Sequence, residues 1–282
     1  MAGLIGAALG GLAIRHGWTE TPGICMVVPA LMLVPGPHLI NGVYDVLENH
    51  VLPGVCRLGL ATGILIATAT SVGLLSFRVS YTNSPQFTFM TWNLFLAWIP
   101  LVLGAGTFAL HRIGAPWWSL PLVAIPWLLF LPNAPYLVTD FSHLEWAHSM
   151  PRWFDILVLG SFATTGLILG GVSLYLVQLV VRERFGQPAG WGFVASVCVL
   201  CGAGIYLGRY LRLNSWDVLS DWRLFVEMAW YRGTDPLGNP ALLETVALSA
   251  IMVALSYLVV AWMVGAGSRW AARWVSTTSH ET

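Results

Sequence analysis

The sequence predicts an all-α fold, a multi-pass transmembrane helical bundle with about six full spans and a short N-terminal broken segment or hairpin. The first reason is composition, because the chain has 282 residues of which 57% are hydrophobic and only 9% are charged. A soluble globular chain is nearer 25% charged, so this composition excludes a soluble enzyme and a disordered protein. The second reason is length, because several apolar stretches approach the roughly 20 residues that a membrane helix needs.

Apolar stretches follow one another along most of the chain. The candidate spans are residues 51–77, 92–110, 116–131, 156–181, 191–207 and 242–264. The third of these is short and rich in proline. Two further stretches, 1–14 and 24–34, are too short to cross a bilayer alone at about 1.5 Å per residue, so we expect half-helices or one broken hairpin there.

Residues 38–50 have one polar and one apolar face. Asn41, Asp45 and Glu48 fall at helical spacing, and apolar side chains cover the opposite face. This pattern predicts an amphipathic helix lying at the membrane interface. A polar stripe of this kind is more often a solvated face than a binding site.

A change of composition near residues 82–86 predicts a domain boundary. Small residues are frequent before it, and Trp and Pro are frequent after it. We therefore expect an N-terminal fragment (1–81), a multi-span membrane domain (87–268) and a polar tail (269–282). Small residues four apart suit close helix packing, and they recur at Gly6 and Gly10, Gly59 and Gly63, Gly166 and Gly170, and Gly204 and Gly208.

Charge and cysteine content limit the partners. Lys+Arg is 13 and Asp+Glu is 13, every basic residue is Arg, and no basic run exists. Nucleic acid is therefore not expected as a partner, and the lipid bilayer is. Cys198 and Cys201 lie inside an apolar helical pattern, which indicates small buried hydrophobes rather than a redox or zinc site. We expect no cofactor and no metal.

Two polar clusters interrupt the apolar pattern, one at residues 131–146, followed by His148, Arg152 and Asp155, and one at residues 208–222. Two apolar segments separate them, so both clusters emerge on the same side of the membrane if each segment crosses once. Asn93 falls on that side by the same count. Pro132 and Pro135 bracket Asn133 and prevent a regular helix there. Irregular backbone at membrane depth is tolerated where it is buried in protein or lines water.

Ionisable groups near these ends predict a polar pocket. Arg209 and Arg212 share a helix face, and Asp140 and Asp155 are the available partners in the other cluster. The candidate binding residues of this pocket are Asn93, Asn133, Tyr136, Asp140, His143, Asp155, Arg209, Arg212, Asn214 and Asp217.

Plainer interpretations of these residues stay open. An Arg–Asp pair can be a structural pair that fixes helix register. His143, Glu145 and His148 have the residue types of metal ligands, but their spacing is not an established zinc pattern, so an interfacial loop is favoured. Asp140, Ser142 and His143 are nearly adjacent and cannot easily converge as a catalytic triad.

From about residue 92 to 264 the chain resembles the bacterial membrane family known as domain of unknown function 1361. The stretches that carry the resemblance are N-L-F-L-A-W-I-P-L, L-F-L-P-N-A-P-Y-L-V-T-D, W-F-D and G-R-Y-L-R-L-N-S-W-D. The resemblance implies an integral membrane protein without an established activity. It also implies that Asn133, Tyr136, Asp140, Arg209, Asn214 and Asp217 belong together.

Residues 1 to about 77 resemble the C-terminal part of the threonine/serine exporter family, carried by V-V-P-A-L-M-L-V-P-G-P-H-L-I-N-G-V-Y-D. That family exports small hydroxy amino acids through many spans. Only a fragment is present here, so it would need a membrane partner subunit or a homo-oligomer to enclose a pathway.

Together these features favour a multi-pass protein of the bacterial inner membrane that is transport-related and acts on a small polar solute such as an amino acid. A membrane-embedded enzyme is an alternative, with Asp140, His143 and Asp217 as acid/base candidates at the extracytoplasmic face. A non-catalytic accessory or assembly subunit is another. Placing the Arg182/Arg184 loop in the cytoplasm puts both clusters outside.

Overall fold

The computed structural model describes residues 51–146, 150–213 and 239–278, together with the single residues 215, 223 and 227. The predicted N-terminal broken segment and the interfacial helix at 38–50 lie outside the described residues. Asn214 and Asp217 of the predicted pocket also lie outside them, as do His148 and the end of the polar tail.

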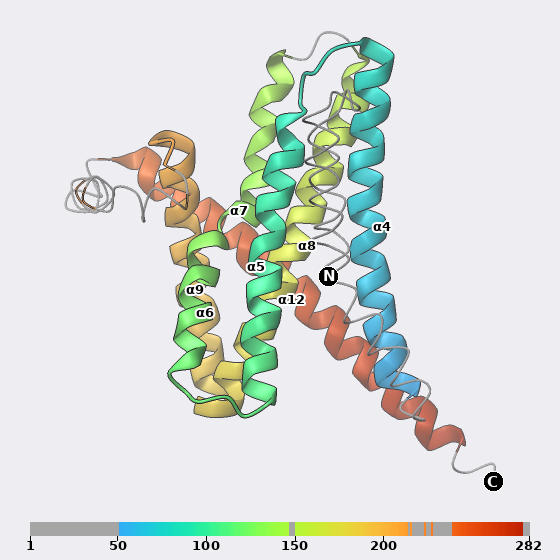
Figure 1. The fold of residues 1–282 in the computed structure, drawn as a ribbon, viewed down its shortest axis with the longest axis vertical. Coiled ribbons are helices and arrows are strands. Elements are labelled where there is room, and N and C mark those ends of the chain that lie inside the picture. Colours follow the sequence, from blue (N-terminus) through green and yellow to red (C-terminus); the bar gives the residue numbers. More distant parts are fainter. Residues whose placement is uncertain are drawn as a thin grey trace, which may run out of the picture. The chain divides into compact units, whose positions relative to one another are not determined.

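Helices make up the regular structure of the described ranges, which contain no strand (Figure 1). Six segments are long and apolar enough to cross a membrane, so the predicted six-span all-α fold is confirmed. In chain order the helices are α4 (Val51–Thr82), α5 (Phe89–Arg112), α6 (Ser119–Phe130), α7 (Asn133–Tyr136), the 3-10 helix η1 (Leu137–Trp146), α8 (Arg152–Phe185), α9 (Gln187–Tyr210) and α12 (Pro240–Thr278).

The third span differs in length from its prediction. The sequence pattern ended it at residue 131, whereas the apolar segment continues from Ser119 to Glu145. It is interrupted after Phe130, and the single turn of α7 and then η1 complete it. Pro132 and Pro135 lack the amide donors of a regular helix, and the one-turn helix closes instead with the Tyr136 amide donating to the Pro132 carbonyl at 3.0 Å.

The chain forms two compact units, and the first comprises Met1–Phe95, His143–Thr165 and Val259–Thr282. Within its described part, α4 packs on the beginning of α8. The Ser71 and Thr165 hydroxyls are buried and lie 3.1 Å apart. Near the end of α4, the rings of Phe77 and Phe154 have centroids 5.6 Å apart.

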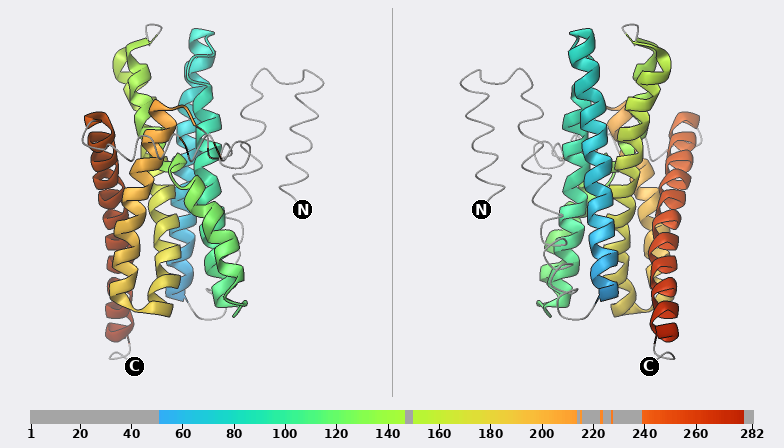
Figure 2. Two further views of the ribbon diagram at one scale, coloured as in Figure 1. Left: turned by 90° about the vertical axis from the view of Figure 1, so that its left-hand side faces the viewer. Right: turned by 90° about the vertical axis from the view of Figure 1, so that its right-hand side faces the viewer.

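The second unit comprises Leu96–Ser142 and Gly166–Leu258. Trp127 of α6 donates its indole N–H to the Ser173 hydroxyl of α8 at 2.7 Å, and Ser173 donates to the Pro100 carbonyl of α5 at 2.6 Å. These buried bonds tie three helices together. On the other side, α9 lies against the first half of α12, where Gly202 meets the Val246 carbonyl, and the two ribbons run side by side in Figure 2.

Candidate functional site

The interruption of the third span lies directly on α8. A Cβ atom built on Gly166 would lie 2.3 Å from the Ala134 carbonyl oxygen, and one on Gly170 would lie 3.2 Å from the Ala134 Cβ. No larger side chain fits at Gly166 without movement of the α7 backbone. The backbone of the one-turn helix is therefore held against α8 by two glycines one helical turn apart.

A second pair of glycines holds the same segment from the side of α9. A Cβ on Gly204 would lie 2.5 Å from the Pro132 ring, and one on Gly208 would lie 3.4 Å from the Tyr136 ring. We call residues 132–136, with these two pairs of glycines, the clamped turn. Its packing explains how an irregular backbone is accommodated, since protein surrounds it on two sides.

The predicted glycine spacings thus have different outcomes. The pairs in α8 and α9 both form close contacts, as their spacing predicted. The pair Gly59 and Gly63 has no neighbouring atom within 4 Å of a built Cβ, so no packing contact uses it in the described structure. The pair Gly6 and Gly10 lies outside the described residues.

Polar groups from the second cluster cover the clamped turn. Asn133 donates through Nδ2 to the Phe130 carbonyl and to the Ser215 hydroxyl, both at 2.9 Å. Ser215 in turn donates to the Leu129 carbonyl at 3.1 Å. The Ala134 amide donates to the Leu131 carbonyl at 3.1 Å instead of to Phe130, so these side-chain bonds supply donors to the Phe130 and Leu129 carbonyls where α6 is interrupted.

Arg209 brings a positive charge to the same region. It lies half-buried in the last turn of α9 and donates through Nη2 to the Ser142 hydroxyl of η1. Arg212 follows with a left-handed φ of 55° and an exposed side chain. The chain turns back there, so that the Leu213 amide donates to the Leu207 carbonyl at 3.3 Å. The structure therefore brings together parts of both predicted clusters.

The remaining candidates are distributed over the two units. Asp140 lies in η1 and is buried, with 1% of the residue exposed, and Tyr136 lies half-buried against Gly208. Asn93 and His143 belong to the first unit. Asn93 is half-buried in α5, and the His143 ring contacts the Phe89 ring edge-on at 4.9 Å.

Asp155 has a different partner from the one the sequence suggested. We expected Asp155 to be available to Arg209, but its carboxylate accepts from Arg78 of α4, with Nε and Oδ1 2.5 Å apart. Both side chains are fully buried. The signal that could have indicated Arg78 is its position, a single arginine at the end of an otherwise apolar span.

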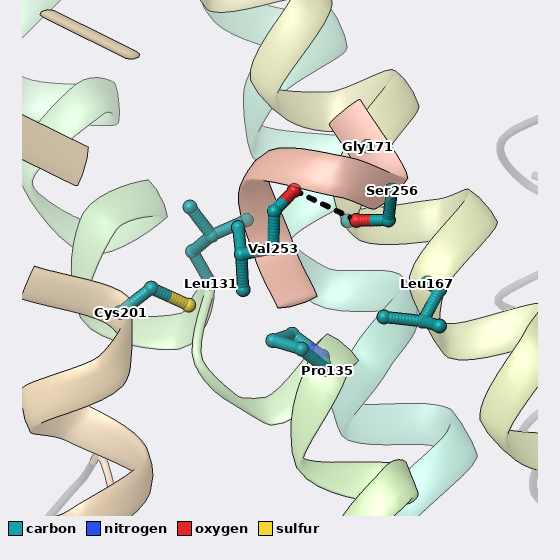
Figure 3. A pocket seen from close by; sticks show the side chains of 8 residues that line it. Leu131, Pro135, Leu167, Gly171, Cys201, Val253 and Ser256 are labelled. Atoms are coloured by element: carbon teal, nitrogen blue, oxygen red, sulfur yellow. Dashed lines mark hydrogen bonds between the residues drawn. The ribbon is translucent and has the colours of Figure 1, made fainter. Parts of the chain in front are cut away.

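A small apolar pocket lies next to the clamped turn (Figure 3). The Ser256 hydroxyl points to the Val253 carbonyl, to which it donates at 2.8 Å, so it offers little to a polar ligand. Cys201 is a buried free thiol in this lining, and Cys198 is another nearby in α9. The lining residues are Leu131, Pro135, Leu167, Gly170, Gly171, Cys201, Val253 and Ser256.

The polar groups beside the clamped turn have the chemistry of an anion site. A guanidinium presents five N–H donors in a planar fork, and the bond from Arg209 to Ser142 uses one of them. Both Nδ2 hydrogens of Asn133 are already donated, to the Phe130 carbonyl and the Ser215 hydroxyl, so Arg209 supplies the donors for an anion. Within the described ranges no three His, Cys, Asp or Glu side chains gather where they could hold a metal ion.

Comparisons with known families agree with both resemblances. The family model described as "Protein of unknown function (DUF1361)" matches residues 92–255. The model described as "Putative threonine/serine exporter" matches residues 1–77. The two predicted resemblances are therefore confirmed at their predicted positions.

Curated relatives match a short part of the chain. A protein of Klebsiella aerogenes named "Probable succinate transporter subunit YjjP" is 36% identical over 69 residues, which are 24% of this chain and 27% of the relative. The Escherichia coli K12 protein of the same name is 38% identical over 55 residues, or 20% and 22% of the two chains. The chain thus spans about a quarter of the length of these relatives. No solved structure matches the chain.

Proposed function

The chain belongs to the protein family of unknown function DUF1361, and from that premise we propose that it is a transport-related protein of the bacterial inner membrane. Its solute is small and polar and carries a carboxylate, as an amino acid does. The site comprises the clamped turn with Asn133, Ser142, Arg209 and Ser215.

The observation that carries this proposal is the interrupted third span. Transporters commonly place substrate sites where a membrane helix is discontinuous, because the break frees backbone groups and admits polar side chains. Here the break between α6 and α7 receives Ser215, and Arg209 of α9 reaches Ser142 on the same segment. An apolar bundle that served only as an anchor would need neither the break nor the charge.

The chemistry of Arg209 supports a carboxylate as the recognised group. Its guanidinium donates to Ser142, which uses one of its five N–H donors. Carboxylates pair with such a fork through two parallel hydrogen bonds. The matching relatives are named for succinate and the matching N-terminal family for threonine and serine, and these solutes share a carboxylate.

The N-terminal fragment is proposed to act together with a partner. Residues 1–81 form the exporter-like fragment, 87–268 the multi-span domain and 269–282 the tail. The curated relatives are named as subunits, which supports a second membrane subunit or a homo-oligomer that completes a pathway.

Solute counterflow in proteoliposomes tests the proposal. The purified chain is reconstituted, and exchange of labelled succinate, threonine and serine is measured separately. We expect exchange of at least one solute, which Arg209→Gln abolishes. Arg184→Gln is the matched control, because Arg184 is exposed in the last turn of α8. If Arg209→Gln and Arg184→Gln exchange solute alike, the proposed site is wrong. If no solute exchanges, the chain alone completes no pathway, and solute binding to the purified chain decides: without saturable binding the proposal is wrong and an accessory subunit is the better interpretation.

A further inference from the structure

A buried ion pair in the first unit has no role in the site described above. Arg78 of α4 and Asp155 of α8 are both fully buried, in helices apolar enough to span a membrane. Charges at such positions are costly, and ionisable residues inside membrane spans pair with one another and mark ion or proton pathways. The pair therefore calls for a functional account.

The pair is only half satisfied on its acidic side. Asp155 Oδ1 accepts from Arg78 Nε at 2.5 Å, but Oδ2 is buried and has no hydrogen-bond partner among the described residues. A structural arginine–carboxylate pair commonly uses both oxygens in a fork-to-fork arrangement. A buried carboxylate oxygen without a donor is a place where a bound proton would lower the cost of burial.

Arg78 has a second set of partners that does not include Asp155. Its Nη1 and Nη2 atoms donate to the Gln86 backbone carbonyl at 3.3 Å and to Gln86 Oε1 at 3.1 Å. Its guanidinium also lies 4.4 Å from the centre of the Phe87 ring, which is a favourable cation–π distance. The guanidinium would therefore stay held if Asp155 became neutral.

Among the described residues of the first unit, no other titratable group forms an ion pair with Arg78 or Asp155. The described residues put no second charged group within ion-pair distance of Asp155. From α5, the segment Phe89–Phe95 carries no titratable side chain. The His143 ring of η1 contacts Phe89, while Glu145 of η1 and Arg152 of α8 are exposed.

We propose that Asp155 binds a proton, and that it loses its ion pair with Arg78 when the proton is bound. A proton from water forms a bond with Oδ2, the charge of Asp155 is lost, and Arg78 is held by Gln86 and Phe87. The pair then carries a net charge of one. Asp155 lies in the first turn of α8, three residues after the exposed Arg152. Its role in coupling protons to solute movement rests on the proposed transport function.

Infrared difference spectroscopy of the full chain in lipid nanodiscs tests the proton site directly. Acidification is expected to produce the C=O stretch of a carboxylic acid in an apolar environment. Asp155→Asn removes this band, and the control Glu145→Gln, in the same unit but exposed, keeps it. If the wild-type chain lacks the band wherever it stays folded, or if Asp155→Asn retains it, the proposal is overturned.

A second variant acts through Arg78 alone and keeps the carboxylate. Gln86→Ala removes one acceptor of the guanidinium, so Arg78 depends more on the charged form of Asp155. The acid band is then expected to appear at lower pH than in the wild type. If the acid band appears at the same pH in Gln86→Ala as in the wild type, the Gln86 side chain does not hold Arg78 when Asp155 is neutral. The proposed change of partners by Arg78 would then be wrong.

Counterflow under an imposed pH gradient separates the two proposals. If the proton site is coupled to transport, a gradient accelerates solute accumulation in the wild type but not in Asp155→Asn. If the pH gradient accelerates solute accumulation equally in the wild type and in Asp155→Asn, the proposed coupling is wrong, whereas the proposed transport function is unaffected. If no solute is exchanged under any condition and none binds to the purified chain, the proposed function fails, whereas the infrared band still decides whether Asp155 binds a proton.

Discussion

Gly166→Ala is expected to destabilise the clamped turn, because the new methyl group would meet the backbone of α7. The built Cβ lies 2.3 Å from the Ala134 carbonyl oxygen and 2.7 Å from Leu137 Cδ1. The carbonyl would have to retreat by about 1 Å to reach ordinary contact distance. It belongs to the peptide that precedes Pro135, which restricts rotation of that backbone.

The magnitude follows from two opposing effects. Overpacking of this kind typically costs about 1–3 kcal/mol. Ala in place of Gly in a helix returns up to about 1 kcal/mol, so we expect a net loss of roughly 1–2 kcal/mol for Gly166→Ala. The matched control is Gly63→Ala in α4, where no atom lies within 4 Å of a built Cβ. That variant should be as stable as the wild type or slightly more stable.

Denaturant unfolding in detergent micelles, followed by tryptophan fluorescence, measures both variants. The expected order of the free energy of unfolding is Gly63→Ala at or above the wild type and Gly166→Ala below both. Solute exchange should fall in parallel for Gly166→Ala, since the turn carries Asn133. Equal stability of the two variants would refute the close packing of α7 on α8.

Three further changes test the buried polar contacts. Ser173→Ala leaves the Trp127 indole N–H buried without its acceptor, and the unfolding free energy should fall by about 1–3 kcal/mol; no change would mean that this bond is not formed. Asn133→Ala removes both amide hydrogen bonds of the clamped turn and should lower stability by a similar amount and weaken solute binding, and unaltered binding would count against the site. Arg78→Ala leaves an uncompensated buried carboxylate at Asp155 and should cost about 3–5 kcal/mol. Replacing both partners of that pair by Leu should restore much of the loss, and the account of the pair is wrong if the double variant is no more stable than Arg78→Ala.

The spans were predictable because the length of an apolar run can be counted directly in the sequence. A helix that crosses a bilayer needs a long apolar run whatever its neighbours are. The interruption of the third span was also visible, since Pro132 removes a backbone donor in any fold. Its continuation to Glu145 was not, because it depends on how the segment packs between α8 and α9.

Pairing between residues that are distant along the chain could not be predicted from the sequence. Arg78 lies one residue past the predicted first span and belongs to neither polar cluster, so nothing local pointed to Asp155. Glycine spacing predicted which faces could approach closely, but Gly59 and Gly63 have the same spacing and contact nothing. A spacing defines a face of a helix, and the rest of the fold decides what meets that face.

The most direct test of the carboxylate site is equilibrium binding of labelled succinate, threonine and serine to the purified full-length chain. Binding needs no completed pathway and therefore no partner subunit. The account predicts saturable binding of at least one solute, weakened about tenfold or more by Arg209→Gln, since a charge-assisted hydrogen bond contributes roughly 1.5–3 kcal/mol. Arg184→Gln should bind as the wild type does. No saturable binding, or equal affinity in the wild type and Arg209→Gln, would contradict the account.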